Sequence, residues 1–223
     1  MHMVNKLHII WDLDGTLIDS EQEVLNALIK SVRDVGLMEK DQKSPFRVGP
    51  TVDKILDTSF SPSVLTGDKK KEIIKNFRLN YDNCGFKHTP PFVGIENILK
   101  DSFFIHHIVT NKPDLATGRI IEKLGWKQYF VSIVTPYSYI KSADDKRKTK
   151  TELFALCMSD YPDEKFVGIG DMETDAKAAL ENNIPAIGVL WGTGTREELE
   201  KSGCTYISNS ICNLYEHLKL LTK

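Results

Sequence analysis

Long hydrophobic runs are absent from the 223-residue sequence. No stretch approaches the ~20 consecutive apolar residues that a membrane-spanning helix needs. The residues that follow Met1–Lys6 do not form the extended apolar segment of a signal peptide. We therefore expect a cytoplasmic protein with no membrane partner.

A strong excess of charge of one sign is absent as well, since the formal net charge is -2. A nearly neutral chain gives no general reason to bind a nucleic acid or an anionic membrane surface. A locally positive pocket can still hold a small anion. We therefore expect no nucleic-acid partner and look for a small-molecule site.

Cysteine is scarce, and its 4 copies form neither a CxxC pair nor a regular framework. This pattern argues against a disulfide scaffold and predicts free thiols in a reducing compartment. Internal repeats and low-complexity tracts are also missing. The hydrophobic fraction of 41% is that of an ordinary globular chain with material for a core. The cysteines are Cys84, Cys157, Cys204 and Cys212.

Several short apolar runs are present, and each ends at a polar or glycine-containing turn. They cover residues 7–11, 103–109, 130–134, 166–169 and 186–191. Helix-like segments at 115–124, 153–158 and 176–180 separate the later runs. Unalternated apolar strands separated by helices predict an α/β fold, a doubly wound Rossmann-like parallel sheet. Ligands of such sheets bind at the carboxyl ends of the strands.

The region after the first apolar run breaks this alternation. Val24, Leu28 and Val32 share one helical face, and similar patterns recur around 55–56 and 73–81. We find no convincing strand in this region. The sequence therefore predicts a small α-helical cap domain over residues 20–86, inserted into a catalytic core formed by residues 1–19 and 87–223.

Two carboxylates follow the first predicted strand in the sequence Asp12-Leu13-Asp14-Gly15-Thr16. If the chain stays extended there, the side chains of Asp12 and Asp14 point to the same side. Two like charges so close are costly unless a cation or a shared proton relieves the repulsion. A polar turn is the alternative interpretation, because Asp-Gly is a common turn pair.

Polar residues also end two other predicted strands. Thr110 and Asn111 could bind phosphate oxygens, or they could simply cap the following helix. Asp171 and Asp175 lie four residues apart, where a strand end meets a helix start, and they could serve as N-cap and helix-dipole charge. Because the strand ends share one edge of the sheet, the combined set predicts an oxygen-rich site for Mg²⁺.

These segments, taken with a later lysine, resemble the four signature motifs of the haloacid dehalogenase superfamily, in the order and with spacing similar to that family. The resemblance covers nearly the whole chain. The position of the helical insert resembles the subfamily that includes the phosphoglycolate phosphatases. Further similarities to that subfamily are Asp19-Ser20, Val48-Gly49-Pro50, Lys112-Pro113 and Trp191-Gly192-x-Gly194.

The resemblance implies a Mg²⁺-dependent hydrolase with an aspartyl-phosphate intermediate on Asp12. Asp14 would protonate the leaving oxygen and then activate water. Mg²⁺ would be bound by Asp12, by Asp171 and by Asp14 through its backbone carbonyl. Asp175 would orient the motif lysine or a metal-bound water. The phosphoryl group would be bound by substrate-contacting residues Thr110, Asn111 and Gly15.

The motif lysine has two candidates in the basic segment 146–154. Some relatives read Arg-x-x-Lys-x-Glu-Leu here, a pattern that maps onto Arg147 and Lys150 and makes Thr151 the helix N-cap. We therefore assign Lys150 as the catalytic lysine, with Lys148 as the alternative. The rest of this basic segment is interpreted as a solvated loop.

The predicted function is that of a phosphatase acting on a small phosphorylated metabolite, similar to phosphoglycolate phosphatase. Asp14 argues against a dehalogenase and a phosphonatase, because these relatives lack the second acid. A sugar-phosphate mutase similar to β-phosphoglucomutase, a nucleotidase and a pyrophosphatase stay open. A non-catalytic binding module on the same fold is a more remote alternative.

Overall fold

The computed structural model describes residues 6–49, 51–138 and 147–222. Pro50 and Lys146, which the sequence comparison singled out, lie outside these ranges. The chain divides into two compact units, Met1–Asp19 with Pro91–Lys223, and Ser20–Pro90. Within the described ranges, no helix combines the length and the apolar character that crossing a bilayer requires.

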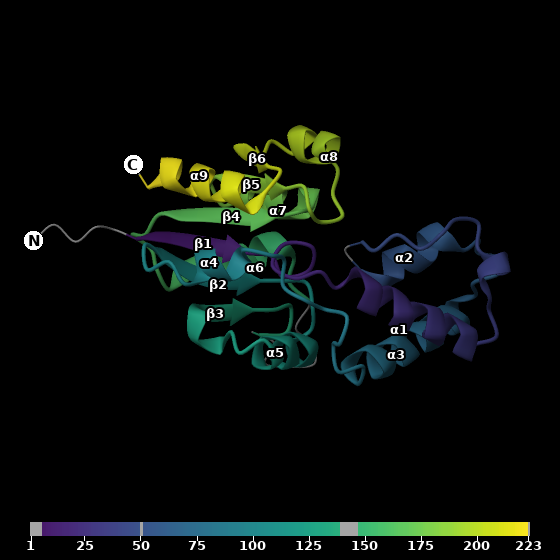
Figure 1. Cartoon of the computed structure of the whole chain (residues 1–223). Helices are drawn as coiled ribbons and strands as arrows, with labels where there is room; N and C mark the ends of the chain where they lie inside the picture. The colour runs from purple at the N-terminus through teal and green to yellow at the C-terminus, as the bar shows by residue number, and fades with distance from the viewer. Residues whose placement is uncertain (1–5, 50, 139–146, 223) are drawn as a thin grey trace, which may run out of the picture. The chain divides into compact units, whose positions relative to one another are not determined.

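A six-stranded sheet forms the first unit, and all its strand pairs are parallel. The order is β3-β2-β1-β4-β5-β6, which can be followed from bottom to top in Figure 1. The doubly wound α/β core is therefore confirmed. The strands are β1 (Leu7–Trp11), β2 (Phe104–Val109), β3 (Phe130–Val134), β4 (Phe166–Gly170), β5 (Ala186–Val189) and β6 (Tyr206–Ser208).

Helices connect the strands of this unit. Three of them correspond to the predicted helical segments, and their ends differ from the predicted ones by one to three residues. The others, and strand β6, were not among the predicted elements; most are short, and α8 contributes a single buried apolar residue, Leu199. The helices are α4 (Ile95–Leu99), α5 (Asp114–Lys123), α6 (Lys150–Ser159), α7 (Glu173–Glu181), α8 (Arg196–Lys201) and α9 (Ile211–Leu221).

One face of the sheet packs against α6 and α7. Ile10 and Val109 on the sheet share a buried cluster with Phe154 of α6 and Ala179 of α7. Gly168 in β4 allows the close approach, because a Cβ there would lie 2.8 Å from both Ala179 Cβ and the Phe154 ring. This packing fixes the start of α6 against the sheet, and that start carries a residue of the site described below.

Aromatic and polar side chains fill the other face. Trp11 Nε1 donates a hydrogen bond to His106 Nδ1 at 3.0 Å. Tyr215 of α9 donates to Asp101 at 2.6 Å and packs edge-on against Phe104. His106 is buried. Both faces of the sheet are therefore covered, as its apolar strands require.

In the second unit, all the regular elements among the described residues are helices. Its helices are α1 (Glu21–Asp34), α2 (Val52–Ser59) and α3 (Gly67–Asp82), with a short 3-10 turn at Glu39–Asp41. Thr51 and Thr66 cap α2 and α3, because each side chain accepts a hydrogen bond from the amide three residues on. The apolar faces read from the sequence form the interior of this unit, with Leu28, Ile73 and Phe77 buried.

Candidate active site

Three chain segments meet at the carboxyl edge of the sheet because β1 lies between β2 and β4. Asp12 follows β1, Thr110 follows β2, and Asp171 follows β4. Trp11 pairs with Ile108 on one side and with Ile169 on the other, so the three ends lie at the same level. The structure thus brings together the three segments that the sequence analysis placed on one edge.

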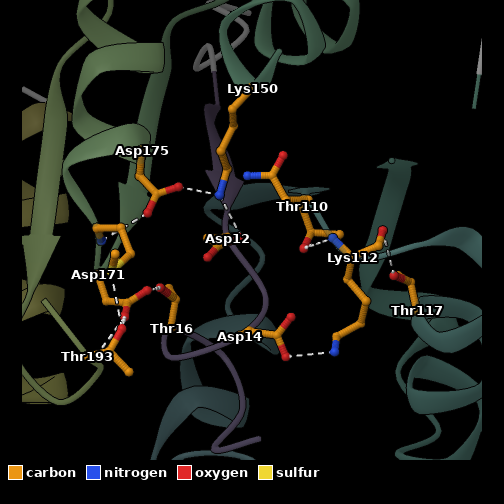
Figure 2. Close-up of polar contacts among 12 residues, drawn as sticks. Asp12, Asp14, Thr16, Thr110, Lys112, Thr117, Lys150, Asp171, Asp175 and Thr193 are labelled. Carbon is orange, nitrogen blue, oxygen red and sulfur yellow. Dashed lines mark hydrogen bonds and ion pairs between the residues drawn. The ribbon is translucent and has the colours of Figure 1, made fainter. Parts of the chain in front are cut away.

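Lys150 reaches this edge from the first position of α6. Its Nζ lies 2.7 Å from Asp12 Oδ1 and also forms an ion pair with Asp175 Oδ1 (Figure 2). All three side chains are buried. Lys148, the alternative candidate, lies in the segment that precedes the helix and is half-buried.

The start of α6 is set by Thr149, so the expectation that Thr151 is the N-cap is wrong. The Thr149 hydroxyl accepts a hydrogen bond from the Glu152 amide at 3.3 Å. Glu152 Oε2 in turn accepts from the Thr149 amide at 2.7 Å, which completes a capping box. Thr151 is already inside the helix and donates to Glu181. This cap places Lys150 at the helix start with its side chain toward the sheet edge.

Asp171 is held by two threonines. Its Oδ1 accepts from Thr16 Oγ1 at 3.3 Å, and its Oδ2 accepts from the Thr193 amide at 2.7 Å and the Thr193 hydroxyl at 3.0 Å. Thr193 was not predicted as a site residue, although it lies in the Trp191-Gly192-x-Gly194 segment. The glycines of that segment were the available signal. Gly194 is needed there because a Cβ would lie 1.8 Å from the Asp171 carbonyl oxygen, so glycine lets the loop approach Asp171.

Gly15 permits the first loop to approach the same carboxylate. Its φ is +78°, in the left-handed region that favours glycine, and a Cβ there would lie 2.4 Å from Asp171 Oδ2. Its amide donates to the carbonyl of Ile18, which closes the turn after β1. The structure therefore gives Gly15 a packing function at the site, while phosphoryl binding by Gly15 stays a prediction.

Three buried carboxylates form a cluster that could hold a metal ion. One oxygen each from Asp12, Asp171 and Asp175 lie within 4.8 Å of one another. Burial raises the pKa of Asp12 to about 7, although Lys150 opposes the shift. Burial, followed by the charge of Asp12, raises the pKa of Asp171 to about 6. The pKa of Asp175 is also raised, chiefly by burial.

Among the described residues, one lysine forms ion pairs with this cluster of three acids. Burial lowers the pKa of Lys150, but the charges of Asp12 and Asp175 outweigh that effect and raise it above its ordinary value. Lys150 therefore carries one positive charge among three acids. Hard oxygen ligands with excess negative charge suit Mg²⁺, so the residues present fit this ion.

The carboxylate of Asp14 lies outside this cluster and forms an ion pair with a different lysine. Asp14 Oδ1 is 3.0 Å from Nζ of Lys112, which follows Thr110 and Asn111 in the loop after β2. Lys112 belongs to the Lys112-Pro113 pair noted above as a similarity to the phosphatase subfamily, and no function was predicted for it. Figure 2 shows the two pairs separately, Lys150 with Asp12 and Lys112 with Asp14.

The loop after β2 is fixed by hydrogen bonds to its backbone. Thr110 Oγ1 accepts from the Lys112 amide at 3.1 Å. Arg147, from the segment before α6, donates to the Asn111 carbonyl at 3.1 Å. Thr110 is buried and Asn111 is partly exposed. The backbone of the loop that we predicted to bind phosphate is therefore anchored at Asn111 and at Lys112.

Comparisons with known proteins agree with this arrangement. Residues 9–189 match the family model of haloacid dehalogenase-like hydrolases. A phosphoglycolate phosphatase of Aquifex aeolicus is 28% identical over 189 residues, covering 82% of this chain and 84% of the relative. A tyrosine-protein kinase PtkA of Mycobacterium tuberculosis is 24% identical over 208 residues, covering 91% and 68%. The crystal structure of a predicted phosphatase from Clostridium acetobutylicum superimposes with a TM-score of 0.77 at 27% identity, covering 97% and 99%.

Proposed function

We propose, from the premise that the chain belongs to the haloacid dehalogenase-like hydrolase family, that it hydrolyses a small phosphate monoester through an aspartyl-phosphate. The observation that carries this proposal is the buried pair of Asp12 and Lys150 at the carboxyl edge of the sheet. A carboxylate held beside an ammonium can attack a phosphoryl group whose own charge is partly offset.

In the first step, an oxygen of Asp12 attacks phosphorus and the bond from phosphorus to the leaving oxygen breaks. Asp14 gives its proton to that oxygen, so the alcohol leaves neutral. In the second step, Asp14 accepts a proton from water as the water oxygen attacks the aspartyl-phosphate. Inorganic phosphate leaves and the carboxylate of Asp12 is restored. Thr110, Asn111 and Gly15 bind the phosphoryl oxygens in both steps.

Mg²⁺ is part of the proposal because three clustered acids share one ammonium among the residues that the structure describes. Asp12, Asp171 and the backbone carbonyl of Asp14 would hold the ion. When bound, it supplies positive charge that offsets the repulsion between an anionic nucleophile and an anionic phosphate. Asp175 keeps the Lys150 ammonium directed at Asp12.

The proposed substrate class is a small phosphorylated metabolite with an alkyl leaving group. Several relatives are named phosphoglycolate phosphatases, which supports phosphoglycolate as the first compound to test. We further propose that the helical region 20–86 acts as the substrate-selecting cap of a core formed by 1–19 and 87–223. Nucleoside monophosphates, pyrophosphate and sugar phosphates belong in the same screen.

A phosphate-release screen over these compounds with Mg²⁺ tests the proposal. We expect turnover of at least one phosphomonoester, and complete loss of it in Asp12→Asn with an unchanged circular dichroism spectrum. Undiminished activity of Asp12→Asn would contradict the nucleophile assignment. Quantitative transfer of labelled phosphate to a second hydroxyl, without free phosphate, would instead identify a mutase.

Because three of the relatives are named tyrosine-protein kinase PtkA, the same preparation is tested with γ-labelled ATP and a tyrosine-containing protein. We expect label to appear as inorganic phosphate or to stay on ATP. Label on protein tyrosine that requires Asp12, without phosphomonoester hydrolysis, would replace the proposed phosphatase with a kinase.

A further inference from the structure

We propose that Lys112 is the positioning residue for Asp14, holding the carboxyl group of Asp14 where it exchanges a proton with the leaving oxygen and with water. This inference rests on the proposed function, because it assigns a partner to the acid–base residue of that reaction. It separates two lysines at the site: Lys150 is paired with Asp12, and Lys112 with Asp14.

The ion pair itself is the first observation. Lys112 Nζ lies 3.0 Å from Asp14 Oδ1, and the side chain of Lys112 is only 6% exposed while that of Asp14 is 29% exposed. An ammonium removed from water needs a nearby anion, since an uncompensated buried charge is strongly unfavourable. The more exposed partner, Asp14, is the one that must reach a substrate. The buried partner is therefore suited to hold it in place.

The backbone around Lys112 is fixed on both sides, which gives its side chain a defined origin. Its amide donates to Thr110 Oγ1 at 3.1 Å. Pro113, the next residue, is the N-cap of α5, and its carbonyl accepts from the Thr117 amide at 3.0 Å. The side chain extends from this anchored loop to the loop after β1 (Figure 2). It thereby links the segment proposed to bind phosphate to the segment that carries the acid.

The pairing also agrees with the chemistry required of Asp14. After Asp14 has given its proton to the leaving oxygen, it is a carboxylate, and the second step needs that carboxylate to accept a proton from water. An ammonium at 3.0 Å stabilises this carboxylate as it forms in the first step, so that the proton is released more readily, and holds it in place for the second step. Lys112 therefore acts on the reaction through Asp14 and not by forming a bond to phosphorus.

The alternative is that Lys112 binds the phosphoryl group directly. Leaving-group dependence distinguishes the two, because p-nitrophenolate leaves without a proton whereas an alkoxide does not. The value of kcat/KM reports the steps up to phosphoryl transfer. A residue that acts through Asp14 affects kcat/KM for ethyl phosphate far more than for p-nitrophenyl phosphate. A residue that binds the phosphoryl group affects both substrates equally.

The experiment compares Lys112→Met, Lys112→Arg, Asp14→Asn and the double variant Asp14→Asn with Lys112→Met, using both substrates and Mg²⁺. We expect Lys112→Met to lose about tenfold or more in kcat/KM for ethyl phosphate and less than about threefold for p-nitrophenyl phosphate. Lys112→Arg should recover part of the loss. The double variant should be no slower than Asp14→Asn, because the two residues act as one unit.

Lys177→Met is the matched control, since Lys177 lies on the surface of α7 with a 70% exposed side chain. Equal losses on both substrates, or additive losses in the double variant, would overturn the positioning assignment. So would wild-type kinetics of Lys112→Met. If Lys112→Met does not fold, the losses of kcat/KM on the two substrates are compared between Lys112→Arg and Asp14→Asn. A similar ratio of losses supports the positioning assignment, and equal losses on both substrates in Lys112→Arg contradict it. Absence of phosphate release from the wild type would instead refute the proposed function, and this inference with it.

Discussion

The ammonium of Lys150 lies 2.7 Å from Oδ1 of Asp12 and forms a second ion pair with Asp175, although 138 positions of the sequence separate Lys150 from Asp12. Lys150→Met should therefore leave two buried carboxylates without their cation. We expect kcat to fall by about 10²–10³-fold, since an electrostatic contact to the reacting groups is lost. Steady-state phosphate release measures this effect.

Lys148→Met provides the comparison, because Lys148 is the other lysine that the sequence offers for this function. It precedes the Thr149 cap, whereas Lys150 follows it, and it is half-buried where Lys150 is buried. We expect Lys148→Met to keep kcat within about threefold of the wild type, as is usual for residues outside the reacting centre. A large loss in Lys148→Met with an active Lys150→Met would reverse the assignment.

Removal of divalent cations should abolish activity and lower thermal stability. Chelation leaves the three clustered acids Asp12, Asp171 and Asp175 with one ammonium among them. A cation that binds only the folded state raises the unfolding free energy by mass action, by about 2.7 kcal/mol at 100 times its Kd. We expect Mg²⁺ to raise Tm of the wild type in a concentration-dependent way, and to raise it much less in Asp171→Asn. Equal shifts in both proteins would contradict the proposed ligands.

Sequence reasoning found the elements that local pattern determines. Asp12 and Asp171 could be placed at one edge because each follows an apolar run, and parallel strands bring such ends together. The Thr149 cap was readable from its Thr-x-x-Glu spacing, yet a family pattern favoured Thr151. Contacts made by loops were readable only in part, since Gly192 and Gly194 marked the loop but did not indicate that Thr193 would lie against Asp171.

Loop contacts also explain why no function was predicted for Lys112. In the sequence it is one basic residue after a polar turn, 98 positions from Asp14. Only the order of β2 beside β1 brings the two loops together. Strand β6 was missed for another reason, because its three residues, Tyr206–Ser208, are too short to give a period.

Thr193→Val should weaken metal binding while preserving the fold. The change removes the hydroxyl that donates to Asp171 Oδ2 at 3.0 Å and keeps both the branched shape and the backbone amide that donates at 2.7 Å. Partners that orient a metal ligand are typically worth about 10–100-fold in metal affinity. We expect the Mg²⁺ concentration for half-maximal activity to rise within that range.

Thr193→Ser is the matched control because it keeps the hydroxyl, so it should stay close to the wild type. The Mg²⁺-induced rise in Tm provides a readout that does not depend on turnover. An unchanged Mg²⁺ requirement in Thr193→Val would mean that the Thr193 backbone amide and the Thr16 hydroxyl are enough to orient Asp171.

The buried histidines should make the fold less stable in acid. His107 Nε2 and His8 Nδ1 lie 2.9 Å apart, and His107 Nδ1 lies 2.7 Å from Ser132 Oγ. Burial, followed by the charges of His8 and His106, lowers the pKa of His107 to about 3. Burial lowers the pKa of His106 to about 4.

The direction of the change in stability with pH follows from comparing proton binding in the folded and unfolded states. An unfolded histidine, with a pKa of about 6.5, binds a proton as the pH falls below that value, whereas folded His107 stays neutral until about pH 3. Its stabilising contribution is therefore complete above pH 6.5 and is lost progressively between pH 6.5 and 3. The raised pKa values of Asp12 and Asp171 act in the opposite direction, because these folded acids bind protons that the unfolded chain releases.

His107→Asn isolates the histidine contribution from that of the acids, which stay present in both proteins. The fall in unfolding free energy from pH 7.5 to pH 5.0 should be about 2 kcal/mol smaller in the variant than in the wild type, the amount that one proton bound at pKa 6.5 contributes. Urea unfolding at the two pH values measures it. His217→Asn, at a partly exposed position of α9, is the control for the effect on stability of replacing a histidine by asparagine. If the unfolding free energy fell equally with pH in His107→Asn and the wild type, His107 would be protonated in the folded protein, in conflict with its buried hydrogen bonds.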